Sequence, residues 1–66
     1  MNEAYLIACQ EELRKAIREI ELAQSALQVS LYGETAESIS DVLYKQRSEI
    51  QGCIDRIDNI LKEKRG

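Results

Sequence analysis

The sequence predicts an all-α fold, an antiparallel two-helix hairpin whose long amphipathic helices pack as in a coiled coil. Three observations predict it. The 66-residue chain has no proline and only three glycines, so little in it interrupts a helix. Apolar residues recur every three or four positions in both halves of the chain. Gly33 lies where the first of these patterns stops, and glycine suits the residue just past a helix end.

The first helix is predicted over about residues 2–31. Asn2 is suited to cap its start, and Glu3 lies in the first turn, where a negative charge interacts favourably with the helix dipole. Strong helix formers fill the positions between the apolar residues. The predicted contact seam alternates three- and four-residue steps, as heptads do: Leu6, Cys9, Leu13, Ala16, Ile20, Ala23 and Leu27.

The turn is predicted at about residues 32–36, with Thr35 as a cap for a second helix over about residues 37–64. One long kinked helix is the alternative, but Gly33 close to Thr35 favours a turn. Gly52 lies beside the second seam, and close approach of a neighbouring helix is its expected reason. The second predicted seam is again heptad-spaced: Ile39, Leu43, Gln46, Ile50, Cys53, Ile57 and Ile60.

Folding back through this turn makes residues 1–66 a single helical hairpin. The facing pairs are then all aliphatic, which supports the hairpin: Leu27 with Leu43, Ile20 with Ile50, and Leu13 with Ile57. In this register Cys9 and Cys53 lie ~12 Å apart along the axis, too far for a disulfide. We therefore expect two reduced thiols that act as buried spacers, or one of them on the surface.

Composition and spacing argue against several functions. Nine basic and twelve acidic residues are interspersed, giving a net charge of −3 without the basic face that nucleic acids require. The chain has no histidine, no cysteine pair at metal or redox spacing and no glycine-rich phosphate loop, so we expect neither an enzyme nor a metal or cofactor site. The longest apolar run, residues 4–9, is too short for membrane insertion. No signal peptide is visible, so the cytoplasm is the expected location.

Apolar residues also flank both seams, and they predict that the hairpin binds protein. A contact between two helices covers one stripe on each, whereas the apolar arc here is broader. The predicted protein-binding residues are the flanking ones: Ile17, Leu22, Val29, Leu31, Ile54 and Leu61. Replacing Ile17 and Ile54 with Asp is expected to abolish partner binding and to leave some helicity. The partner can be a different protein, or a second hairpin in a four-helix bundle when the chain is alone.

The chain also resembles a known family. The segment Glu19-Ile20-Glu21-Leu22-Ala23-Gln24-Ser25-Ala26-Leu27, a short polar turn, and Ile50, Ile54, Ile57 and Ile60 near the end of the second helix resemble the YscE/SsaE-like co-chaperones of type III secretion needle subunits. The resemblance covers most of the chain. It implies a helical hairpin that pairs with a tetratricopeptide-type chaperone and keeps the needle subunit monomeric in the cytoplasm. A self-associating structural coiled coil and a small phage-type regulator that docks on a larger protein are the alternatives.

Overall fold

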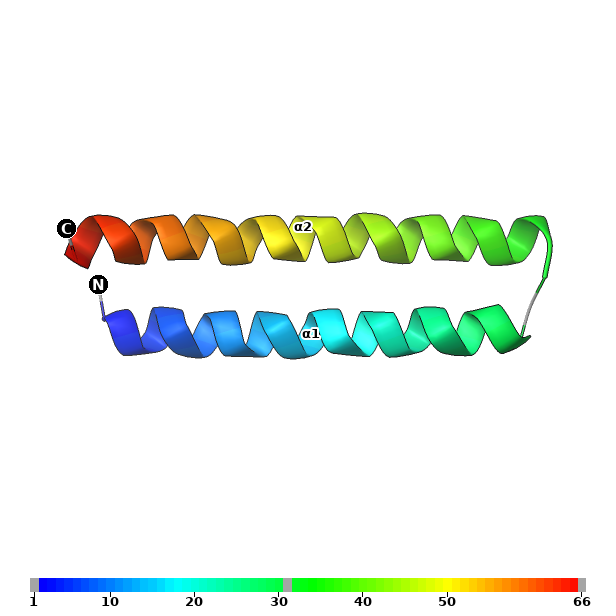
Figure 1. The fold of residues 1–66 in the computed structure, drawn as a ribbon, viewed down its shortest axis with the longest axis horizontal. Helices are drawn as coiled ribbons and strands as arrows, with labels where there is room; N and C mark the ends of the chain where they lie inside the picture. Colours follow the sequence, from blue (N-terminus) through cyan, green and yellow to red (C-terminus); the bar gives the residue numbers. More distant parts are fainter. Residues whose placement is uncertain (1, 31, 66) are drawn as a thin grey trace.

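The computed structural model describes residues 2–30 and 32–65, with side chains as far as Lys64. Helix α1 spans Glu3–Ser30 and helix α2 spans Glu34–Arg65. The two run antiparallel, so that the start of α1 lies beside the end of α2 (Figure 1). The hairpin is 49 Å long and 14 Å across, measured over its Cα atoms. The predicted all-α helical hairpin is confirmed.

Local hydrogen bonds explain where the helices begin. Asn2 caps α1 as predicted, because its Oδ1 accepts a hydrogen bond from the Ala4 amide at 2.9 Å. Gly33 has a φ of +85°, the left-handed conformation expected of a glycine between two helices. The amide of Glu37 donates to the Gly33 carbonyl at 3.1 Å, which closes the first turn of α2. Helix α2 therefore begins earlier than predicted, and Thr35 lies inside its first turn.

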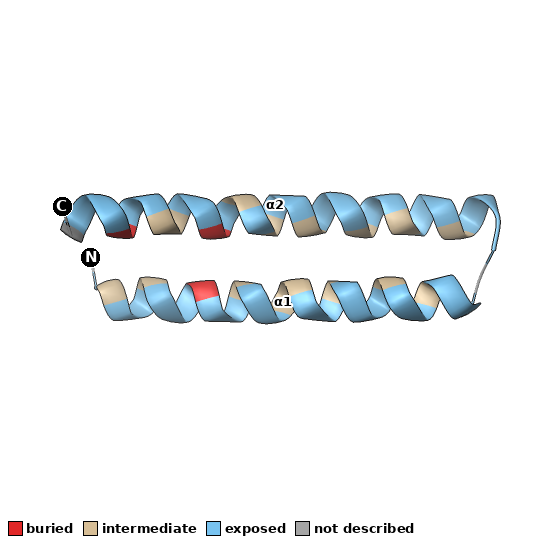
Figure 2. Cartoon of the chain, in the orientation of Figure 1, coloured by how far each residue is buried: buried red, intermediate tan, exposed pale blue. Residues whose placement is uncertain are grey.

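A heptad seam consists of two columns, each a row of residues seven positions apart along one helix. In α1 one observed column agrees with the prediction and the other differs. Leu6, Leu13, Ile20 and Leu27 are turned toward α2 as predicted. The second column consists of Gln10, Ile17 and Gln24, whereas the predicted Cys9 and Ala23 are exposed and Ala16 is half-buried. The buried and half-buried bands of α1 face α2 along the whole hairpin (Figure 2).

The seam of α2 is displaced in the same way. Leu43, Ile50 and Ile57 face α1 as predicted. The other column is one residue further along the chain than predicted: Ser40, Arg47, Ile54 and Leu61 in place of Ile39, Gln46, Cys53 and Ile60. This shift of the seam buries Ile17 in place of Ala16 and Ile54 in place of Cys53. At the ends of α2 it gains no volume, because Leu61 replaces Ile60 and Ser40 replaces Ile39. A fully buried isoleucine or leucine contributes about 1.5–3 kcal/mol, more than alanine or cysteine can.

Two contacts between the helices set the register. Gln10 Nε2 donates to the Ile54 carbonyl at 3.1 Å and to Asp58 Oδ1 at 2.7 Å. Arg47 Nη2 lies 3.6 Å from Glu21 Oε2. Together with the burial pattern, these contacts fit side-chain layers that pair Leu6 with Leu61, Leu13 with Ile54, Ile20 with Arg47, and Leu27 with Ser40. The predicted pairs, such as Leu13 with Ile57, are offset from these by less than one helical turn.

Gly52 has no role in packing within the hairpin. A Cβ atom added there would meet nothing within 4 Å among the described residues, so the expected close approach of a neighbouring helix is wrong for α1 and α2. Glycine inside a helix is less favourable than alanine by about 1 kcal/mol, chiefly because the unfolded chain is freer.

Replacing Gly52 with Ala is therefore expected to raise the free energy of unfolding by about 1 kcal/mol. The same replacement at Gly33 is expected to lower it by roughly 1–2 kcal/mol, because alanine resists a positive φ. Urea denaturation of the two variants and the wild-type chain measures both changes. Equal effects of the two replacements would contradict this account of the glycines.

Candidate functional site

The structure separates the six predicted protein-binding residues into two groups. The side chains of Ile54 and Leu61 are only 3% and 5% exposed, and Ile17 is half-buried. All three lie in the seam between the helices. Their predicted position on the flanks is wrong, because both helices are rotated from the predicted seam by about one residue. A partner cannot reach Ile54 or Leu61 while the hairpin is intact. Leu31 lies outside the described residues.

Leu22 and Val29 form the second group, and they are exposed as predicted. Their exposed fractions are 66% and 79%. Ala26 lies between them and is exposed too, so the three side chains follow i, i+4, i+7 spacing on the side of α1 that faces away from α2. We call Leu22, Ala26 and Val29 the outer strip. This spacing is that of an amphipathic helix that anchors in the groove of another protein.

The outer strip lies in a part of the chain without charge. Residues 22–33 contain no Asp, Glu, Lys or Arg, whereas Glu21 and Glu34 stand at either end of this segment. Tyr32, also exposed, follows the strip at the turn. Covering a charged side chain is costly unless it is paired, and here nothing charged in the segment itself has to be covered. The part of α1 next to the turn, from residue 22 onward, we call the turn half. A partner can cover this surface with the least cost in desolvating charged groups.

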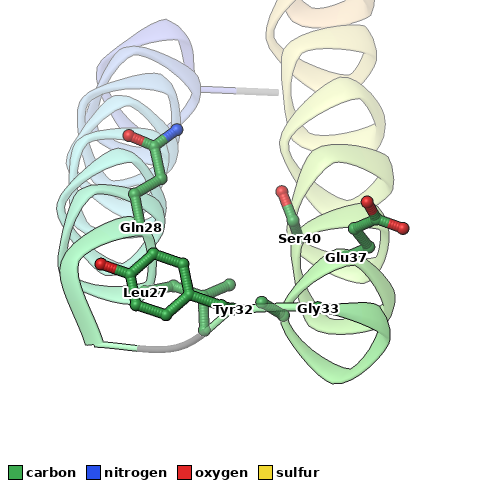
Figure 3. Close-up of a pocket in the computed structure, with 7 residues that line it drawn as sticks. Leu27, Gln28, Tyr32, Gly33, Glu37 and Ser40 are labelled. Carbon is green, nitrogen blue, oxygen red and sulfur yellow. The ribbon is translucent and has the colours of Figure 1, made fainter.

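A shallow pocket of about 280 Å³ lies beside the turn (Figure 3). It arises because the small side chains of Ala36 and Ser40 face Leu27 and leave space between the helices. Gln28 and Glu37 form its polar edge. Its volume suits one aliphatic side chain of a partner, and its position extends the apolar surface of the turn half across to α2.

The contacts between the helices distinguish two long faces of the hairpin. The contacts of Glu21 with Arg47 and of Gln10 with Asp58 lie on one side of the seam, together with the pocket edge formed by Gln28 and Glu37. We call this side the polar face. The opposite side is less polar, and we call it the open face. It consists of the positions just before the second column of each seam: Cys9, Ala16 and Ala23 of α1, and Ile39, Gln46, Cys53 and Ile60 of α2.

The open face carries half of the residues that the sequence analysis assigned to the seam, one column from each helix. Ile39 and Ile60 are exposed there, and Cys9 and Cys53 are free thiols that are also exposed. The expectation that both cysteines are buried spacers is therefore wrong. The hairpin uses one apolar seam for its own core, and a second, unpartnered one lies beside it.

Among residues 2–30 and 32–65, no three His, Cys, Asp or Glu side chains lie close enough to hold a metal ion together. Neither described helix has the length and hydropathy that crossing a membrane requires.

No known protein family matches the chain, no curated protein matches its sequence, and no solved structure matches its fold.

Proposed function

We propose that this chain is a protein-binding hairpin that inserts the outer strip of α1 into an apolar groove of a larger protein. The observation that carries the proposal is the exposure of Leu22 and Val29 at helical spacing within a segment free of charge. Apolar side chains at i, i+4 and i+7 are the anchors of helix-in-groove recognition. A small two-helix fold also gains stability when a partner covers such a surface.

More specifically, we propose that the chain is a co-chaperone of a bacterial type III secretion system. The resemblance to the YscE/SsaE-like family supports it, with a tetratricopeptide-type chaperone as the partner. Tetratricopeptide repeats stack into a superhelix with a concave surface, which is a suitable receptor for one face of a helix. The two proteins together would hold the needle subunit monomeric in the cytoplasm. The alternative is a small regulator that uses the same strip on another protein.

The test is affinity purification of the tagged chain from its native host, with mass spectrometry of the protein recovered at a one-to-one ratio. A tetratricopeptide protein is the expected partner. Replacing Leu22 and Val29 together with Asp is expected to weaken binding about 30-fold, because two anchors would bring charge into an apolar groove. Isothermal titration of the purified pair gives the affinities.

The matched control replaces Ala4 and Ala8 with Asp. Both are exposed residues of α1 outside the outer strip, and the change in net charge is the same. This control is expected to bind within about twofold of wild type, since surface substitutions away from an interface have little effect. Equal binding by both double variants would contradict the assignment of the strip. Recovery of a partner of another class at full affinity would favour the regulator over the co-chaperone.

A further inference from the structure

The open face is the second unpartnered surface of the hairpin, and its size suits an interface. The hairpin measures 49 Å by 14 Å over its Cα atoms, so the face extends over roughly 700 Å². A standard protein interface covers about 800 Å² on each partner. The outline of the full face therefore approaches the standard size, whereas half of it falls well short.

The two helices contribute different shapes to the open face. The column from α1 is small throughout: Cys9, Ala16, Ala23 and Ser30. The column from α2 carries two isoleucines at its ends and a glutamine between them: Ile39, Gln46, Cys53 and Ile60. Small residues on one helix let another helix approach closely, and larger side chains on the second helix fill the gaps between them.

We infer that a second copy of this chain covers the open face, in a four-helix bundle whose two-fold axis runs parallel to the helices. This symmetry places α1 of each copy on α2 of the other, with neighbouring helices antiparallel. A rotation about this axis keeps every residue at the same height along the helices, so the two copies cannot slide past each other. The register between α1 and α2 of one hairpin therefore also fixes the register between the copies.

The side chains then interdigitate over most of the interface. Given the layers that pair Leu13 with Ile54 and Leu27 with Ser40, three of the four α2 residues of the open face fall between two small α1 residues of the other copy, whereas Ile60 lies beyond Cys9. Cys53 falls between Cys9 and Ala16. Gln46 falls between Ala16 and Ala23, and Ile39 falls between Ala23 and Ser30. With a two-fold axis perpendicular to the helices, α1 would instead contact α1 of the other copy, and α2 would contact α2. The small residues of α1 would then face one another and leave gaps.

The rims of the open face bring charges together in a definite way. In the same register, Glu12 lies beside Arg56 of the second copy, an attractive pair. Glu19 lies beside Glu49 of the second copy, a repulsive pair. Ala26 lies beside Val42, which extends the apolar contact toward the turn. All six residues are exposed in the isolated hairpin. Glu12 already pairs with Lys15 of its own helix at 3.1 Å, so Arg56 of the second copy would be a second cation beside the same carboxylate.

The first test is the mass of the purified chain in solution. Sedimentation equilibrium is expected to give twice the 7.5 kDa of one chain at about 100 µM protein. Replacing Ala23 with Arg is expected to weaken the dimer at least about tenfold, because a long charged side chain replaces a small one in the contact. The matched control is Ala8→Arg on an exposed position outside the face, which leaves the dimer unchanged. Circular dichroism confirms that both variants stay helical.

The second test uses the two rim pairs. Glu12→Lys and Glu19→Lys change the net charge equally, yet the first is expected to weaken the dimer about fivefold and the second to strengthen it about fivefold. Adding Arg56→Glu to Glu12→Lys restores the wild-type affinity within about twofold. A monomer at about 1 mM, equal affinity of the Ala23 and Ala8 variants, or the same sign of effect for both lysine variants would each overturn the inference. Each readout uses the chain alone, so it is independent of the partner proposed for the outer strip.

Discussion

Replacing Ile54 with Asp is expected to unfold most of the hairpin. Ile54 is 3% exposed, the most completely covered apolar side chain among the described residues, and it lies in the layer of Leu13. The change removes a buried aliphatic contact and brings a carboxylate without a partner into the seam, at a cost of about 4 kcal/mol or more. A domain of this size rarely has more than about 3–5 kcal/mol of stability. The ellipticity at 222 nm and the urea midpoint measure the loss.

The matched control for this variant is Val29→Asp. It introduces the same carboxylate in place of a branched apolar residue, but at a position 79% exposed in the outer strip. Its effect on unfolding is expected to be within about 0.5 kcal/mol, as for most surface positions. If the Ile54 variant kept full helicity and the wild-type urea midpoint, Ile54 would not lie in the core of the hairpin. The original expectation that this residue serves only partner binding would then return.

The coarse fold could be predicted because each of its signals is local. A cap at Asn2, a helix end before Gly33 and the column of Leu6, Leu13, Ile20 and Leu27 depend on neighbours in the sequence alone. The second column could not be fixed in this way. Positions three and four residues after each of these residues both satisfy heptad spacing, so the choice depends on what the other helix presents.

Side-chain volume favours the observed column in α1, which holds Ile17 where the predicted column holds Ala16. In α2 volume does not decide the choice, because the observed column gains Ile54 and Leu61 but loses Ile39 and Ile60. The observed column of α1 includes Gln10 and Gln24, and polar residues are uncommon in a seam. Gln10 is acceptable there because Asp58 and the carbonyl of Ile54 accept its hydrogen bonds. Those partners are far away in sequence, so only the folded structure reveals them.

The candidate site, too, combines residues that the sequence alone could place and residues whose position depends on the other helix. Leu22 and Val29 were predicted correctly as exposed because they lie opposite the seam in either version of it. Ile17, Ile54 and Leu61 were misplaced because a rotation of one residue moves the flank of a helix into its core. The same rotation moves one column of each predicted seam onto the open face. The broad apolar arc of the sequence thus contains two adjacent seams, and the hairpin itself uses one of them.

The buried glutamine leads to the second strong prediction, that Gln10→Glu destabilises the hairpin by about 3 kcal/mol at neutral pH. Gln10 is 4% exposed and both of its contacts use its amide as the donor. A carboxylate of the same shape has no hydrogen to donate, so it would face the Ile54 carbonyl and the Asp58 carboxylate as a third acceptor. The exposed Gln28→Glu is the control, with an expected change within about 0.5 kcal/mol.

The pH dependence of this deficit identifies its cause. Burial and the neighbouring Asp58 disfavour the charged form of the introduced carboxyl, which raises its pKa in the folded state above the ordinary value of about 4.3. The deficit is therefore smallest below the unfolded pKa, where the protonated carboxyl has one O–H to replace one of the two amide bonds. It grows as the pH rises between the unfolded and folded pKa values and is complete above the folded pKa. Adding Asp58→Asn provides an amide donor and is expected to recover more than half of the loss. Urea denaturation at pH 4 and pH 7 compares the variants, and a deficit that is the same at both would mean that lost packing, rather than charge, destabilises the seam.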